Sequence, residues 1–313
     1  MKDFAGKLAV ITGGGTGMGR ELARQLVAEG CDVAICDVIK ENMAETISIC
    51  AGEAPQGIKI TSHICDVSSE DDVNRFRDEV LEQHGRDHVN LVFNNAGIGA
   101  APSFINGSRE DWERTFNICW FGVYYTSRAF TPLLVASEEG HLVNTSSNGF
   151  WATLGPTSTH SSYAAAKFAV KGFTEALIND FRLNAPHVGV SVVMPGHVGT
   201  SIAINSGVIM GRETLSKEDL DELRSRFPEI AEATDDQLRV YIKQRGEDFR
   251  DKAVTTAADA ATIILNGVRE NRWRILIGPD AEVLDLLVRE APEDAYEQVF
   301  LERLRGKVDW QLG

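Results

Sequence analysis

Several features that would assign a class directly are scarce in this chain. Its 313 residues contain no run of about 18 apolar residues, which a membrane-spanning helix needs. The first ten residues lack the charged-then-apolar pattern of a secretory leader. Basic residues are few, 31 against 46 acidic ones, and the net charge of −15 would repel nucleic acid and anionic membranes. We therefore expect a cytoplasmic protein that binds small molecules.

Cysteine and histidine patterns are equally sparse. The five cysteines are odd in number and fall mostly in strand or helix patterns, which is typical of small buried residues in a reducing compartment and not of a disulfide framework. One pair of histidines has helical spacing, His84 and His88, but Gly85 interrupts it and no acid or cysteine pattern completes a ligand set. We expect no metal site.

The first informative segment is a glycine-rich turn. Residues 8–12, LAVIT, are an apolar run of strand type, GGGTGMG follows, and a helical pattern comes next. Gly13, Gly17 and Gly19 allow a tight turn and a close approach of the backbone to a pyrophosphate, at the positive end of the following helix. The spacing is GxxxGxG and not the strict GxGxxG, and such turns also occur without a ligand.

An acidic residue follows the second expected strand. That strand, residues 32–36, ends at Asp37, about twenty residues past the glycines. A carboxylate there suits the ribose hydroxyls of NAD and repels the 2′-phosphate of NADP. No basic residue lies within the glycine turn, and Val38 and Ile39 follow the acid. The pattern favours NAD as the cofactor.

A tyrosine and a lysine lie four residues apart in YAAAK. The alanines favour helix, and the spacing puts Tyr163 and Lys167 on one helix face. A free phenol titrates near pH ~10, so a phenolate base needs nearby positive charge, which an ammonium supplies. Ser147, in the upstream segment NTSS, offers a hydroxyl to complete an acid/base set. Taken alone, such a pair is far more often found on the surface of an amphipathic helix, so the remaining motifs decide.

Five motifs occur in the order typical of one family. TGGGTGMG, NNAG, NTSS, YAAAK and PGHVGT resemble the motifs of the short-chain dehydrogenase/reductase family, over residues 5–200 and more weakly over 250–280. The resemblance implies hydride transfer between NAD(H) and a secondary alcohol or ketone. The cofactor residues that it implies are Thr12, Gly13, Gly17, Met18, Gly19, Asp37, Asp66, Val67, Asn94, Ala96, Gly97, Tyr163, Lys167, Pro195, Gly196, Val198 and Thr200.

The resemblance also assigns catalytic roles. Tyr163 exchanges the proton, Lys167 supports it, Ser147 holds the substrate oxygen, and Asn117 orders a proton path. The stretch between serine and tyrosine is longer than usual in the family, so Ser146 is the alternative serine. For His197, in PGHVGT, a solvent-facing or loop-packing side chain is the favoured interpretation.

Alternating strand and helix patterns predict the architecture. We expect an α/β fold, a doubly wound parallel sheet of about seven strands, as a single domain over residues 1–313. Within it, residues 1–145 mainly bind dinucleotide and 146–200 carry catalysis. Residues 201–250 form a helical lid over the substrate, or a surface for subunit contact. Residues 251–313 add the last helix, the last strand and C-terminal helices.

The substrate and the assembly are less constrained. Phe150 and Trp151 follow the serine motif and suit a bulky apolar substrate, although loop packing explains them equally well. The family resemblance implies a homotetramer or homodimer. Two alternatives remain open: other NAD-dependent chemistry on the same scaffold, such as enoyl reduction or epimerase or lyase activity, and a non-catalytic NAD-binding interaction protein.

Overall fold

A computed structural model describes residues 1–99, 104–147, 160–211, 215–226, 230–305 and 307. In this part of the chain, seven parallel strands form one sheet in the order β3-β2-β1-β4-β5-β6-β9. The strands are β1 (Leu8–Thr12), β2 (Asp32–Asp37), β3 (Ile60–Ile64), β4 (Leu91–Asn94), β5 (Gly140–Thr145), β6 (Val188–Pro195) and β9 (Arg274–Ile277). The predicted doubly wound sheet is confirmed.

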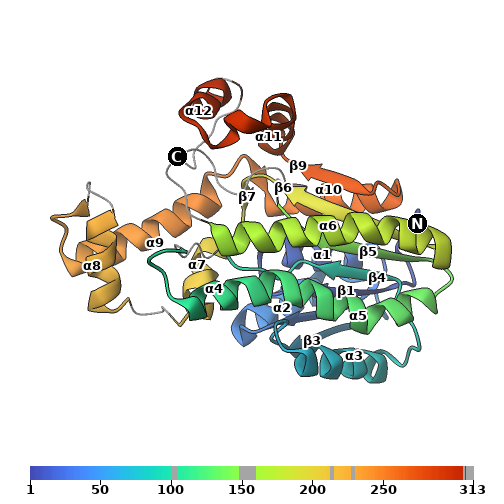
Figure 1. Cartoon of the computed structure of the whole chain (residues 1–313). Coiled ribbons are helices and arrows are strands. Elements are labelled where there is room, and N and C mark those ends of the chain that lie inside the picture. The colour runs from blue at the N-terminus through green and yellow to red at the C-terminus, as the bar shows by residue number, and fades with distance from the viewer. Residues whose placement is uncertain (100–103, 148–159, 212–214, 227–229, 306, 308–313) are drawn as a thin grey trace.

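Helices cover both faces of the sheet (Figure 1). One face carries α3 (Glu70–His84), α4 (Arg109–Phe116), the π-helical turn η1 (Asn117–Phe121), α5 (Gly122–Val135) and α6 (Ser161–Asn184). The other carries α1 (Gly17–Ala28), α2 (Lys40–Glu53) and α10 (Ala257–Arg269). Along β1, Leu8 and Val10 enter the first of these cores, and Ala9 and Ile11 enter the second. Burial on both faces explains why the strand is an uninterrupted apolar run.

The strand order reverses between β1 and β4. In a doubly wound sheet, ligands bind outside the carboxyl ends of the strands at such a reversal. The glycine turn follows β1, and the NNAG segment follows β4. The topology therefore places both motifs at one crevice.

Helices extend the fold on two sides. Residues 201–251 contain α7 (Ile202–Ile209), α8 (Lys217–Arg226) and α9 (Asp235–Asp251), and α8 and α9 project from the sheet in Figure 1. The tail forms α11 (Pro279–Glu290), the 3-10 turn η4 (Pro292–Tyr296) and α12 (Gln298–Leu304), with a break between helices at Pro292. Two short strands, β7 (Val198–Gly199) and β8 (Thr255–Thr256), pair with each other. None of the helices in the described ranges is long and apolar enough to span a membrane.

Candidate active site

The glycine turn lies tightly against the segment that follows β4. Gly13 has a φ of +66°, and a Cβ there would lie 2.8 Å from the Ala96 Cα. Gly17 has a φ of +55°, and a Cβ at this residue would lie 3.0 Å from the Thr200 Cβ. A Cβ on Gly19 would overlap the Gly13 carbonyl. These glycines are therefore required by backbone conformation and by close packing, as the motif predicts.

Asn95 clamps this turn, a role that sequence reasoning missed. Its Nδ2 donates to the carbonyls of Thr12 (3.2 Å) and Gly13 (3.3 Å). The Thr12 hydroxyl in turn accepts from the backbone N–H groups of Asn95 (3.0 Å) and Ala96 (3.1 Å). The signal was present, because Asn95 lies inside the NNAG motif.

Asp37 ends β2 and turns its carboxylate to the crevice. Its oxygens accept from the backbone N–H groups of Gly15 (3.1 Å), Val38 (2.8 Å) and Ile39 (3.1 Å). Burial raises the pKa of this carboxyl above its ordinary value, and the three backbone donors oppose that shift. The carboxylate is thus fixed in place before any ribose binds.

Two adjoining hollows bring most of the predicted cofactor residues together. One, of about 60 Å³, is lined by residues that include Gly13, Asp37, Asp66, Val67, Ala96 and Gly97. The other, of about 100 Å³, shares four of these and adds Thr16, Gly17, Met18 and Thr200. They form one crevice along the carboxyl ends of the strands.

Helix α7 narrows this crevice. Asn205 Nδ2 donates to the Thr16 hydroxyl (3.1 Å), and the Ser206 hydroxyl accepts from the Gly99 N–H (2.8 Å). Ile209 lines both hollows, and its carbonyl accepts from Arg114 Nε (3.2 Å). Nothing in the local sequence marked these α7 residues as crevice residues.

The tyrosine and the lysine lie on α6, one turn apart, as the YAAAK spacing predicts. Lys167 is buried, its Nζ donates to the Thr145 carbonyl (2.9 Å), and it lies 5.5 Å from the centre of the Tyr163 ring. A Cβ on Gly97 would lie 3.5 Å from Nζ. The ammonium is therefore held between the phenol and the crevice.

The two candidate serines differ in their surroundings. Ser146 is 2% exposed, and its hydroxyl donates to the Lys167 backbone carbonyl (2.7 Å). Ser147, the next residue, is half-buried. Ser146 is thus committed to a backbone contact, which favours Ser147 as the substrate-facing hydroxyl. Phe150 and Trp151 lie outside the described residues.

Asn117 begins the π-helical turn η1, where its carbonyl accepts from the Gly122 N–H. Such single π-turns inside helices occur frequently at functional sites. The half-buried Asn117 thus stands where the extra residue of the turn shifts the register of the helix that follows.

Two of the predicted cofactor residues, Asn94 and Thr12, make structural contacts, and so does His197. The buried Asn94 donates through Nδ2 to Ser127 (2.9 Å) and Asn144 (2.8 Å), so its amide joins strands and helix in the core. Thr12 is also buried and clamps the turn as described. His197 is buried, with its ring 4.4 Å from that of Phe249. Loop packing is the correct interpretation of this histidine, and the solvent-facing alternative is wrong.

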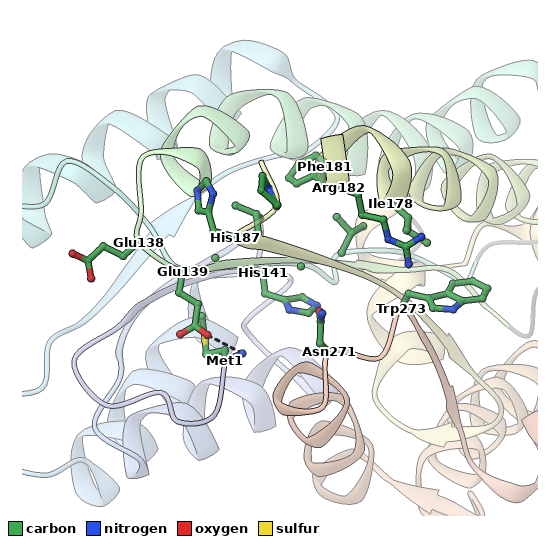
Figure 2. Close-up of a pocket in the computed structure, with 15 residues that line it drawn as sticks. Met1, Glu138, Glu139, His141, Ile178, Phe181, Arg182, His187, Asn271 and Trp273 are labelled. Carbon is green, nitrogen blue, oxygen red and sulfur yellow. Dashed lines mark ion pairs between the residues drawn. The ribbon is translucent and has the colours of Figure 1, made fainter. Parts of the chain in front are cut away.

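A second pocket lies at the other end of the sheet, where β5, β6 and β9 begin (Figure 2). It has a volume of about 540 Å³, and His141 and Trp273 are among the side chains that line it. The described residues around it include none of the motif residues. We assign it no part in the reaction.

Comparison with known proteins decides the family. The family model described as short chain dehydrogenase matches residues 7–207. The chain belongs to the short-chain dehydrogenase family. It is therefore an oxidoreductase, and the resemblance seen in the five motifs is confirmed.

Relatives and solved structures agree. SadH of Mycobacterium tuberculosis is 33% identical over 290 residues, 92% of each chain. Epidermal retinol dehydrogenase 2 of Homo sapiens is 32% identical over 202 residues, 64% of this chain and 63% of the relative. A short-chain dehydrogenase/reductase of Burkholderia phymatum, solved in complex with NAD, superimposes with a TM-score of 0.76 at 29% identity, covering 95% of this chain and 98% of that one.

Proposed function

We propose that this protein transfers a hydride reversibly between NAD(H) and a secondary alcohol or its ketone. The observation that carries the proposal is the buried Lys167 ammonium, 5.5 Å from the Tyr163 ring centre and beside Gly97 of the crevice. A cation fixed at that place stabilises a phenolate, which can take a proton from an alcohol or return one to a carbonyl.

The residues around the crevice suit a dinucleotide. The glycine turn leads into the N-terminus of α1, where a pyrophosphate would bind, and Asp66 and Val67 line the hollow expected for adenine. Asp37 would accept the ribose hydroxyls and exclude a 2′-phosphate. The loop of Pro195, Gly196, Val198 and Thr200 would flank the nicotinamide. When bound, the cofactor supplies the hydride acceptor or donor.

NAD is our choice on the strength of Asp37. The Burkholderia phymatum structure contains NAD, whereas a metagenomic short-chain oxidoreductase, 29% identical over 62% of this chain, was solved with NADP. Structural likeness therefore leaves both cofactors open, and the charge at the end of β2 favours NAD.

The chain's own residues handle the proton. In oxidation, the Tyr163 phenolate removes the hydroxyl proton, and the Ser147 hydroxyl donates a hydrogen bond to the substrate oxygen. By analogy with oxyanion donors, removal of Ser147 should lower turnover by about 10² to 10³. Asn117 would order water on the path by which the proton leaves.

We propose α7 to α9 as a lid over the substrate. The proposal is supported by α7, whose Ile209 lines both hollows of the crevice. The named substrate of the human relative, retinol, is a long apolar alcohol, which supports a bulky apolar substrate. Because retinol is a primary alcohol, this relative supports the apolar character of the substrate and not the secondary position of its hydroxyl.

Assembly and location complete the proposal. The helix face of η1, α5 and α6 carries contacting rings, including Trp120 and Phe173, with centroids 5.4 Å apart, and we propose a homodimer or homotetramer built through this face, in the cytoplasm. Light scattering of the purified protein tests the assembly, and a monomer at micromolar concentration would contradict it.

The test of function is a substrate panel. Purified protein is given NAD or NADP with apolar, aromatic and polyol secondary alcohols, and the reduced cofactor is followed by absorbance. We expect turnover with NAD on an apolar subset. Cofactor binding without turnover on any alcohol or matching ketone would contradict the proposed reaction.

A further inference from the structure

We propose that Asp280 is a positioning residue that fixes the loop of residues 195–200 for the nicotinamide end of the cofactor. This inference rests on the proposed function. Asp280 lies in the first turn of α11, eighty residues beyond the loop, and outside the family-model match. Neither crevice hollow includes it among its described lining residues.

The Asp280 carboxylate is buried with few partners. The residue is 2% exposed, and Oδ2 accepts from the backbone N–H of His197 at 2.6 Å. Oδ1 is also buried, and no hydrogen-bond partner for it exists among the described residues. Burying a carboxylate is costly unless hydrogen bonds compensate. The positive N-terminal end of α11 offsets part of the cost of burying this carboxylate. It does not explain why the carboxylate also bonds the His197 N–H of the loop.

The fold leaves space for this carboxylate by using two glycines. A Cβ on Gly196 would overlap the Asp280 carboxyl group. A Cβ on Gly278, whose φ is +94°, would lie 2.5 Å from Oδ1 and 2.7 Å from the Thr255 hydroxyl. The loop backbone is thus pressed directly onto the acid, and a longer or displaced side chain has no room.

Other contacts hold the loop from the same rear side. The Gly196 N–H donates to the Ile277 carbonyl (2.9 Å), and His197 Nε2 bonds the Phe249 carbonyl (2.7 Å). At its front, Thr200 meets Gly17 and lines the 100 Å³ hollow. Of these three hydrogen bonds to the loop, the one from the His197 N–H to Asp280 has a carboxylate acceptor. Such charge-assisted bonds are about twice as strong as neutral hydrogen bonds. Asp280 therefore determines how far the loop stands from the crevice.

The test separates the two halves of the cofactor. ADP-ribose lacks nicotinamide, so it reports on the glycine turn and Asp37 alone, whereas NADH also needs the loop. For Asp280→Ala we expect the NADH dissociation constant to rise at least tenfold, the scale of one hydrogen bond to a charged group. The dissociation constant for ADP-ribose should stay within twofold. NADH is titrated by fluorescence and ADP-ribose by calorimetry.

Asp285→Asn is the matched control. Asp285 is a buried acid on the same helix, paired with Arg274 and Arg289 away from the loop. We expect this variant to lower thermal stability while the ratio of NADH to ADP-ribose affinity stays unchanged. If Asp280→Ala acted only by loosening the packing of α11, the ratio of NADH to ADP-ribose affinity would be the same in Asp280→Ala and Asp285→Asn.

Asp280→Asn keeps the shape and removes the charge, so it covers the case in which the alanine variant does not fold. We expect about a threefold loss of NADH affinity and none of ADP-ribose affinity. An unchanged ratio in the asparagine variant, or equal losses of both ligands in the alanine variant, would overturn the role of Asp280. Failure of the wild type to bind NADH would instead refute the proposed function.

Discussion

Replacing Asp37 by serine should change the cofactor preference. The carboxylate accepts three backbone N–H bonds, from Gly15, Val38 and Ile39. Without the Asp37 carboxylate, these three N–H groups can bind an anion such as the 2′-phosphate of NADPH, as successive backbone N–H groups do in an anion-binding nest. A hydrogen bond to a charged acceptor contributes about 1.5–3 kcal/mol, so loss of the ribose contact should weaken NADH about 10- to 100-fold.

The same substitution removes repulsion of NADPH. At an effective dielectric constant of about 20, a carboxylate about 5 Å from a phosphate of charge about −1.5 is repelled by about 5 kcal/mol. Asp37 is only half-buried, and solvent screening reduces this repulsion to about 2 kcal/mol. Adding the two effects, we expect the ratio of NADPH to NADH affinity to rise about 10³-fold.

Fluorescence titration with NADH and NADPH measures this ratio. Asp32→Ser is the control, because Asp32 lies at the other end of the same strand and pairs with Arg86. In the wild type, protonation of Asp37 at low pH should weaken the discrimination, and its raised pKa moves this loss to higher pH than for an ordinary carboxyl. An unchanged ratio in Asp37→Ser would refute the assignment of Asp37 as the selecting residue.

Three further substitutions test other parts of the account. Gly13→Ala should abolish NADH binding and lower the free energy of unfolding in urea by about 1–2 kcal/mol, because the added Cβ meets the Ala96 backbone at a positive φ. NADH binding as tight as in the wild type would refute the need for this close backbone contact. Lys167→Met should lower turnover about 10²-fold, since a charge 5.5 Å from the Tyr163 ring contributes about 3 kcal/mol at a dielectric constant of about 20; unchanged turnover would remove Lys167 from catalysis. Burial lowers the pKa of His141 from 6.5 to about 3. The neutral ring therefore contributes fully to stability above pH 6.5. This contribution decreases as the pH falls from 6.5 toward 3, by up to about 1.4 kcal/mol per pH unit. Urea unfolding of His141→Gln from pH 7 to pH 4.5 should therefore show a shallower pH dependence, and an equal slope would contradict the buried neutral ring.

Local patterns were enough to predict the main crevice residues. The glycine turn, Asp37 and the YAAAK pair each have a signal in the local sequence, although Gly13 and Gly17 also pack on the distant Ala96 and Thr200. The doubly wound parallel sheet of about seven strands followed from the alternation of strand and helix patterns.

The remaining site residues depend on distant contacts. Asn95 clamps a turn 83 residues earlier, and Ser206 meets a loop 107 residues away. Ser146 and Ser147 have the same local sequence signal, and the burial of Ser146 and its bond to Lys167 distinguish them. The π-turn at Asn117 changes the helix register by one residue.

The central claim is hydride transfer assisted by Tyr163. The most direct measurement uses NADH labelled with deuterium at the transferring position, with a ketone from the reactive set, and mass spectrometry of the alcohol formed. We predict one deuterium in the product with the wild-type protein, and no product with Tyr163→Phe although NADH still binds. An alcohol without deuterium, or wild-type rates in the phenylalanine variant, would contradict the account.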